Sequence, residues 1–202
     1  MSLDTLAFSG GFQEPVFEAQ AVFRTLMDCL ARPGTIGQLT ATVLPPKPLT
    51  AAAGAVALTL CDHDTPVWLT PTLKASALPA WLAFNAGAPV TEERQNARFA
   101  LVEKGAMLPN LCLFAQGTQE YPDRSTTLIV EIESFEGGRP LVLKGPGIRS
   151  EEEIAPVGLP DMFPHFWAEN GQNFPRGVDL VLVAGDRILC LPRTTVISVK
   201  EA

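Results

Sequence analysis

Histidines, paired cysteines and several common catalytic motifs are scarce or missing in this sequence, which excludes some kinds of chemistry. Only His63 and His165 occur, so a histidine-based catalytic triad has few candidates. The cysteines show no C-x-x-C spacing, and the phosphate-loop, nucleophile-elbow and zinc-protease motifs are absent. We expect every cysteine to be a buried free thiol because all have apolar neighbours. They are Cys29, Cys61, Cys112 and Cys190.

Long apolar runs and a basic charge balance are also missing. No stretch approaches the ~18 apolar residues of a membrane-spanning helix. No lysine or arginine precedes Arg24, so the basic start of a secretory signal is absent. The formal net charge of −7 argues against a nucleic-acid-binding surface as the main role. We therefore expect a cytoplasmic protein with no membrane and no nucleic-acid partner.

Length and composition predict one domain over residues 1–202. Of the 202 residues, 47% are hydrophobic and 18% charged, as in ordinary globular proteins. A chain of this size buries about 70% of its unfolded surface and needs no disulfide to fold. Residues 1–14 are rich in Ser, Gly and other small side chains, so we expect a flexible N-terminal arm.

Residues 178–191 predict a buried strand hairpin. The first run is apolar except for Asp179, so we expect both faces of this strand to be covered. Gly185 and Asp186 separate it from a second apolar run, residues 188–191. A two-residue loop with Gly in first place indicates a type II′ turn.

Helical periodicity dominates the first half of the chain. An apolar stripe at i, i+3, i+4 spacing predicts a helix that starts at Pro15 and ends at Arg32-Pro33-Gly34. The stripe consists of Val16, Ala19, Phe23, Leu26, Met27 and Leu30. Further helices are expected over residues 49–61, 76–85, 107–115 and 159–170.

Strands are expected between and after these helices, over residues 66–70, 99–102, 127–135, 140–143 and 194–199. Residues 127–135 alternate in polarity, and Gly137-Gly138 turns the chain. We therefore expect 140–143 to return as the antiparallel partner of 127–135. Together the elements predict an α/β fold, a three-layer arrangement of helices around a mixed β-sheet.

Arginine and threonine side chains near the C-terminus are the first candidates for ligand contact. The guanidinium of Arg193 and the hydroxyl of Thr194 suit phosphate oxygens. Arg139 and Arg24 are weaker candidates of the same kind. The residues around Arg193 also fit an edge strand with exposed polar groups, and the sequence leaves this alternative open.

Asp62-His63-Asp64 contains possible metal ligands. Consecutive strand residues point to opposite faces, so at most Asp62 and Asp64 could share an ion. A turn whose aspartates accept hydrogen bonds from nearby backbone N–H groups explains the same letters, and we expect no metal. Lys144 is the one lysine whose position suggests a pyridoxal phosphate Schiff base. The residues alone thus predict an α/β domain without an evident catalytic apparatus.

Short sequence motifs spread over nearly the whole chain indicate a family resemblance. The most specific are D-T-P-V-W-L at 64–69 and P-R-T-T at 192–195. Others are Phe23-Arg24, Pro33-Gly34, Leu58-Thr59-Leu60, Gly137-Gly138-Arg139, Ile154-Ala155-Pro156 and Phe174-Pro175. In these motifs the chain resembles the phosphonate metabolism family PhnH, the H subunit of the bacterial carbon–phosphorus lyase complex.

The resemblance implies a fold similar to the large domain of pyridoxal-phosphate-dependent transferases, without the cofactor or its lysine. It implies a homodimer that also associates with the G, I and J subunits. With the G, I and L proteins, such a subunit is needed to join a phosphonate to the ribose of ATP with loss of adenine, the α-D-ribose 1-methylphosphonate 5-triphosphate synthase reaction. ATP and a phosphonate are then substrates of the complex. The family assigns this subunit no catalytic residue.

Two alternatives from other functional classes stay open at this point. One is a stand-alone enzyme that acts on a phosphorylated small molecule through Asp62, Asp64 or an arginine cluster. The other is a divergent pyridoxal phosphate enzyme, which would be a coloured protein.

Overall fold

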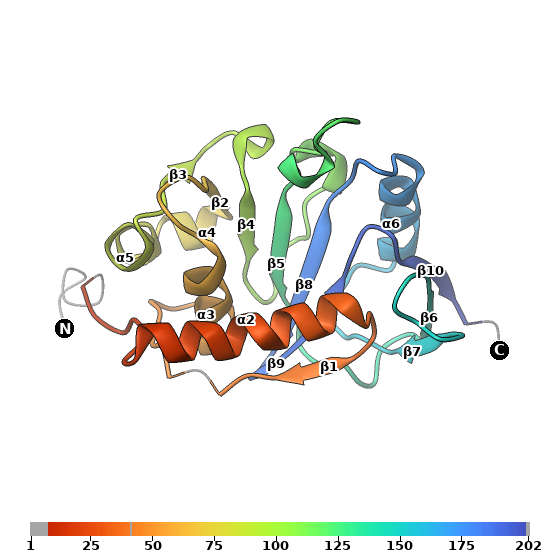
Figure 1. Cartoon of the computed structure of the whole chain (residues 1–202), viewed down its shortest axis with the longest axis horizontal. Helices are drawn as coiled ribbons and strands as arrows, with labels where there is room; N and C mark the ends of the chain where they lie inside the picture. Colours follow the sequence, from red (N-terminus) through yellow and green to blue (C-terminus); the bar gives the residue numbers. More distant parts are fainter. Residues whose placement is uncertain (1–7, 41, 201–202) are drawn as a thin grey trace.

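The computed structural model describes residues 8–40 and 42–200, which form two β-sheets with helices around them. Figure 1 shows helix α2 running across the large sheet, and the small sheet beside helix α6. The helices are α2 (Pro15–Ala31), α3 (Ala51–Leu60), α4 (Pro71–Lys74), α5 (Leu78–Ala86) and α6 (Phe163–Gln172), with 3-10 turns η1 (Arg94–Asn96), η2 (Leu111–Leu113) and η3 (Pro122–Arg124). The strands are β1 (Ile36–Gln38), β2 (Val67–Leu69), β3 (Val90–Thr91), β4 (Phe99–Val102), β5 (Thr127–Glu131), β6 (Leu141–Lys144), β7 (Glu152–Ile154), β8 (Asp179–Ala184), β9 (Arg187–Leu191) and β10 (Val196–Val199).

The large sheet has seven strands in the order β1-β9-β8-β5-β4-β2-β3. Neighbours from β8 to β3 run parallel, and β9 and β1 extend the sheet with antiparallel pairs. The predicted α/β fold with a large mixed sheet is therefore confirmed. The predicted hairpin is confirmed too, because β8 and β9 pair directly on either side of Gly185 and Asp186. Gly185 takes a φ of 63°, which a type II′ loop requires at that position.

Both faces of the large sheet are covered. Helices α2, α3 and α5 cover one face, where they bury apolar residues such as Leu26, Val56 and Trp81 against the strands. On the other face, α6 and the loop around η2 share the covering with the three-stranded sheet β10-β6-β7. The second outer layer is thus part helix and part sheet, where the sequence predicted helices alone.

The predicted pairing of 140–143 with 127–135 is wrong. Strand β5 lies between β4 and β8 as a central parallel strand, whereas β6 pairs with β10 and β7 in the small sheet. The polarity alternation that suggested a half-exposed strand is misleading, because Glu131 is buried and hydrogen-bonded by Thr50. A buried, satisfied carboxylate looks like a solvent-facing one in the sequence.

Two expectations about helices also need correction. Residues 107–115 form only the 3-10 turn η2, because Pro109 interrupts the segment and the Asn110 side chain caps a short turn through the Cys112 N–H at 2.9 Å. In α2 the buried residues are Val22, Leu26 and Cys29. Of the predicted stripe, Leu26 is buried and Leu30 packs against the core, whereas Val16, Phe23 and Met27 are exposed.

The expected N-terminal arm lies partly outside the described residues. Its described part, residues 8–14, has no regular secondary structure. It is nevertheless docked, because Trp81 Nε1 donates to the Ser9 carbonyl at 2.8 Å and Leu44 N donates to the Gly10 carbonyl at 2.8 Å. Phe8 contacts Phe84 edge-on, with ring centroids 5.2 Å apart.

Candidate functional site

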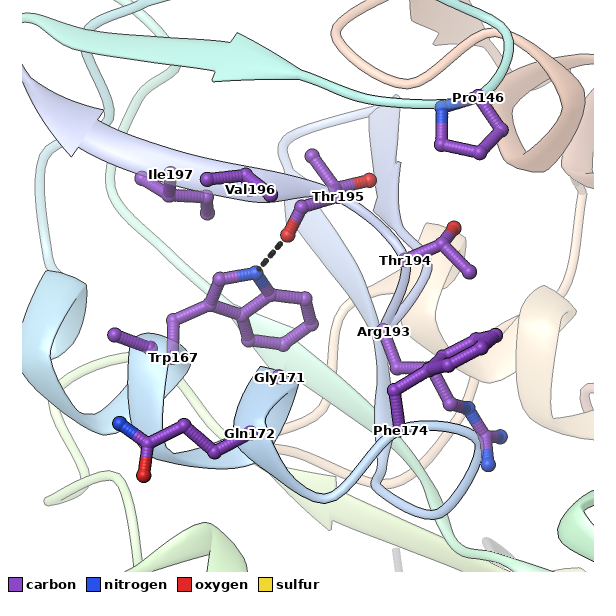
Figure 2. A pocket seen from close by; sticks show the side chains of 11 residues that line it. Pro146, Trp167, Gly171, Gln172, Phe174, Arg193, Thr194, Thr195, Val196 and Ile197 are labelled. Atoms are coloured by element: carbon purple, nitrogen blue, oxygen red, sulfur yellow. Dashed lines mark hydrogen bonds between the residues drawn. The ribbon is translucent and has the colours of Figure 1, made fainter.

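Arg193 and Thr194, the first candidates for ligand contact, line a cavity between helix α6 and the segment that leads into β10 (Figure 2). Its volume is about 520 Å³, within the usual range for small-molecule sites. The lining residues are Pro146, Trp167, Ala168, Gly171, Gln172, Phe174, Arg193, Thr194, Thr195, Val196 and Ile197. Most of this surface is apolar, and Arg193 is its one charged side chain.

The Arg193 guanidinium is fully occupied by groups of the protein itself. Its Nε donates to Asp179 Oδ1 at 3.1 Å, and its Nη2 donates to Asp179 Oδ2 and to Ser125 Oγ. Its Nη1 donates to the carbonyls of Pro122 at 2.8 Å and Pro175 at 3.4 Å. These contacts use all five N–H donors that an arginine has. A phosphate could bind here only by displacing internal hydrogen bonds.

The fold explains why Arg193 and Asp179 meet. In the β8–β9 hairpin Leu180 faces Leu191, so the same register places Asp179 beside the residues that follow β9. The Arg193 N–H then donates to Asp179 Oδ1 at 2.7 Å. The predicted hairpin already contained this information: counting outward from its two-residue loop brings the single charged residue of the apolar run next to the arginine. The sequence analysis did not use that count and missed Asp179.

Thr194 and Thr195 shape the wall of the cavity. Trp167 Nε1 donates to the Thr195 carbonyl at 2.7 Å, which fixes α6 against this segment (Figure 2). A Cβ at Gly145 would lie 2.8 Å from the Thr194 carbonyl, and Gly145 has a φ of 142°, so only glycine fits there. The buried Thr195 Oγ1 has no hydrogen-bond partner in the described structure. The cavity therefore offers a mainly apolar surface, to which the Thr195 hydroxyl is not exposed.

The other arginine candidates lie elsewhere. Arg24 is exposed on α2, against the opposite face of the large sheet from α6. Arg139 is exposed just before β6, beside a small hollow of about 200 Å³. The structure thus brings Arg193 and Thr194 together but joins neither Arg24 nor Arg139 to them.

Asp62 and Asp64 form a turn between α3 and β2. The Asp64 N–H donates to Asp62 Oδ1 at 2.9 Å, and the Asp62 N–H donates to Thr65 Oγ1 at 2.6 Å. This is the turn that the sequence offered as the alternative to a metal site. Across residues 8–40 and 42–200, no group of three or more His, Cys, Asp or Glu side chains is placed to hold a metal ion.

The cysteines are free, and three of the four are buried as expected. Cys112 is exposed on η2, which corrects the expectation for that residue. Burial raises the pKa of Cys61 to about 12. Cys29 and Cys190 lie together between α2 and β9, and the hydrogen bond that the Cys190 thiol shares with Cys29, with burial, raises the pKa of Cys190.

Lys144, the candidate for a Schiff base, pairs with Glu151 at 3.4 Å on the surface. Over the described part of the chain, no helix is long and apolar enough to cross a bilayer. The fold and the cavity define an α/β domain in which Arg193 and Asp62 serve internal hydrogen bonds, and no nucleophile, base and orienting group are assembled among the predicted candidates.

The comparisons with known proteins identify the family of this chain. The profile of the family described as "Bacterial phosphonate metabolism protein (PhnH)" matches residues 10–198. The chain therefore belongs to the PhnH family. It is 60% identical over 195 residues to "Alpha-D-ribose 1-methylphosphonate 5-triphosphate synthase subunit PhnH" of Rhizobium meliloti (strain 1021), covering 96% of this chain and 98% of the relative. It is 37% identical over 89 residues to "Putative C-P lyase subunit protein HtxG" of Stutzerimonas stutzeri, covering 43% and 44% of the two chains.

Proposed function

We propose that this protein is the H subunit of an α-D-ribose 1-methylphosphonate 5-triphosphate synthase in phosphonate metabolism. The observation that carries the proposal is the 60% identity over 98% of a relative that bears this name. The structure supports a subunit role, because the Arg193 guanidinium and the Asp62 carboxylate are engaged in internal hydrogen bonds. No observation favours a stand-alone enzyme built on these residues.

The proposal includes an assembly with the G, I and J subunits, a homodimer of the isolated protein and a cytoplasmic location. Helix α2 supports such contacts. Val16, Phe23 and Met27 lie on one side of this helix at i, i+7, i+11 spacing and are 77%, 47% and 48% exposed. An exposed apolar helix face of this kind is typical of a surface that binds another protein. Arg24 lies on the same side.

Co-expression of the tagged protein with the G, I and J subunits tests the proposal. We expect the four proteins to co-purify in fixed stoichiometry. We also expect the gene to restore growth on methylphosphonate, as sole phosphorus source, to a strain that lacks its own H subunit. Purification without partners together with failed complementation would overturn the proposal. Omitting the tag provides the control for non-specific retention.

We further propose that the domain is related to the large domain of pyridoxal-phosphate-dependent transferases and has no use for the cofactor. The mixed seven-stranded sheet with helices on both faces supports this relationship. Added pyridoxal phosphate should leave the absorption spectrum of the protein as the sum of its components. A new band that borohydride treatment fixes to a lysine would contradict the proposal.

A further inference from the structure

A second large cavity lies at the carboxyl ends of strands β2 and β4. Its volume is about 640 Å³, large enough for a nucleotide-sized ligand. The loops that follow the two strands form its walls, starting at Thr70 after β2 and at Glu103 after β4. The sequence analysis named no residue of this cavity as a ligand-contact candidate, although Trp68 lies in the motif at 64–69.

The connections that follow β2 and β4 run to opposite faces of the sheet. After β2 the chain passes to α4 and α5, and Leu73 and Leu78 pack on the face that α2 and α3 cover. After β4 it passes to η2, and Leu108 and Leu111 pack on the opposite face. Because β2 and β4 are parallel neighbours, their two following loops separate and open a crevice between them. In open parallel sheets, ligands bind in such crevices, at the carboxyl ends of the strands where the connections diverge.

Two cationic side chains, Arg94 and Lys104, line the crevice. Arg94 lies with its guanidinium carbon 4.7 Å from the centre of the Trp68 ring, and its Nε is buried without a hydrogen bond. Lys104 is exposed at the crevice. Within the described residues, neither side chain forms an ion pair. In the part of the chain that the structure describes, no protein group accepts a hydrogen bond from the Arg94 guanidinium, so its terminal N–H groups are available to an acceptor in the crevice.

The wall that carries Lys104 is anchored. The Lys104 N–H donates to Glu131 Oε2 at 3.3 Å, and the other oxygen of Glu131 accepts hydrogen bonds from Thr50 at the start of α3. Glu103 is buried and accepts a hydrogen bond from the Thr70 hydroxyl. The loop after β4 is thus tied to the sheet before any ligand binds, which lowers the entropy cost of binding.

We propose that this crevice binds a phosphate- or phosphonate-bearing ligand, with the Arg94 guanidinium and the Lys104 ammonium as its anion contacts. An arginine fork and a neighbouring ammonium group are the donors that phosphate and phosphonate oxygens prefer. This goes beyond the proposed function, which assigns no ligand to this subunit. It is also independent of that function, since an anion site can exist whether or not the subunit assembles.

Isothermal titration of the purified full chain tests the proposal with three probes: sodium tripolyphosphate, ATP and methylphosphonate. We expect saturable binding of at least one probe, weakened about tenfold or more in Arg94→Met and in Lys104→Met. Binding of tripolyphosphate and ATP alone assigns the site to phosphate chains, and binding of methylphosphonate alone assigns it to the phosphonate. Both results support the shared anion chemistry.

Arg98→Met is the matched control. Arg98 is only four residues from Arg94 but lies at the amino end of β4, away from the crevice, so its replacement should leave binding unchanged. Lys104 is exposed, so Lys104→Met is expected to fold even if Arg94→Met does not. Absence of binding of all three probes would overturn the proposal, as would unchanged affinity in Lys104→Met and a folded Arg94→Met. Co-purification of Arg94→Met with the other subunits keeps this outcome separate from the subunit role.

Discussion

At the scale of single residues, the contact between Arg193 and Asp179 decides how one corner of the molecule is built. The two side chains are 11% and 21% exposed, and their ion pair joins the start of β8 to the segment after β9. The same guanidinium reaches the carbonyls of Pro122 and Pro175, so residues 122–125, residues 175–179 and the segment after β9 meet at one side chain. Breaking a buried pair is costly, because the charge that remains loses its partner but stays away from water.

Arg193→Met should therefore lower the free energy of unfolding by about 3 kcal/mol, because Asp179 would be left as a nearly buried, unpaired carboxylate. Denaturant unfolding followed by circular dichroism measures this loss. The double variant Asp179→Leu with Arg193→Met should recover much of it, since two apolar side chains leave no charge unpaired. Arg187→Met is the control, because it breaks an exposed pair with Glu136 and should change stability far less. Equal losses for Arg193→Met and Arg187→Met would contradict the structural role of Arg193.

The cysteines allow a second prediction at this scale. Cys112 is exposed and the other three thiols are buried, so the native protein should react at one thiol with an aromatic disulfide reagent at pH 8, and at all four after unfolding. Cys61 should stay unreactive in the folded state. Burial raises its pKa to about 12, so the reactive thiolate forms only as the pH approaches that value. Cys112→Ser should abolish the fast reaction, and a second fast thiol would contradict the burial of the other cysteines.

At the scale of the elements, the sequence predicts that a helix or strand forms better than it predicts which other elements pair with it. The run 178–184 and the loop at Gly185 predict the β8–β9 hairpin because the turn residues and the apolar runs act within a few positions. The partner of 140–143 is a different matter. Both 127–135 and 196–199 are apolar enough to pair with it, and only the packing of the whole sheet selects β10.

Helix α2 shows the same limit on prediction. Its apolar residues cover more of its circumference than the core needs, so periodicity predicts a helix without showing which side is buried. The residues of α2 that are buried in the core are Val22, Leu26 and Cys29, whereas Phe23 and Met27 face outward. The binding candidates were equally hidden. The hairpin register could have placed Asp179 beside Arg193. Nothing in the sequence, however, showed that Pro122 and Pro175 would accept its remaining donors, or that Arg94 would be left with a free N–H.

The exposed side of α2 carries a prediction about assembly. Phe23→Ser combined with Met27→Ser should leave the thermal midpoint nearly unchanged, because both side chains are about half exposed. The same variant should lose co-purification with the other synthase subunits, because their apolar contact on α2 would be replaced by hydroxyls. Leu113→Ser is the matched control, since Leu113 is similarly exposed but lies on η2. Full retention of the partners by the double variant would place the subunit contact elsewhere.

At the scale of the whole molecule, the two sheets share one core. Leu141, Leu143 and Ile197 of the small sheet belong to the same buried cluster as Leu128 and Leu180 of the large sheet. Helix α6 joins both, because Trp167 packs in this cluster and donates to the Thr195 carbonyl just before β10. Buried apolar contact that runs without a break from one sheet to the other favours a single cooperative unit, as the length of the chain predicted.

Leu143→Ala tests this cooperativity, because Leu143 is fully buried in the small sheet. Deleting its side chain should lower the free energy of unfolding by about 3 kcal/mol through lost burial and a residual cavity. Denaturant transitions followed by tryptophan fluorescence and by far-ultraviolet circular dichroism should shift together and remain single. Val142→Ala, one residue earlier and facing away from this core, should cost much less. If Leu143→Ala produced two separate transitions, the small sheet would unfold on its own and the chain would contain two units. In that case the cavity between α6 and β10 would open before the large sheet is lost, because strand β10 forms one wall of it.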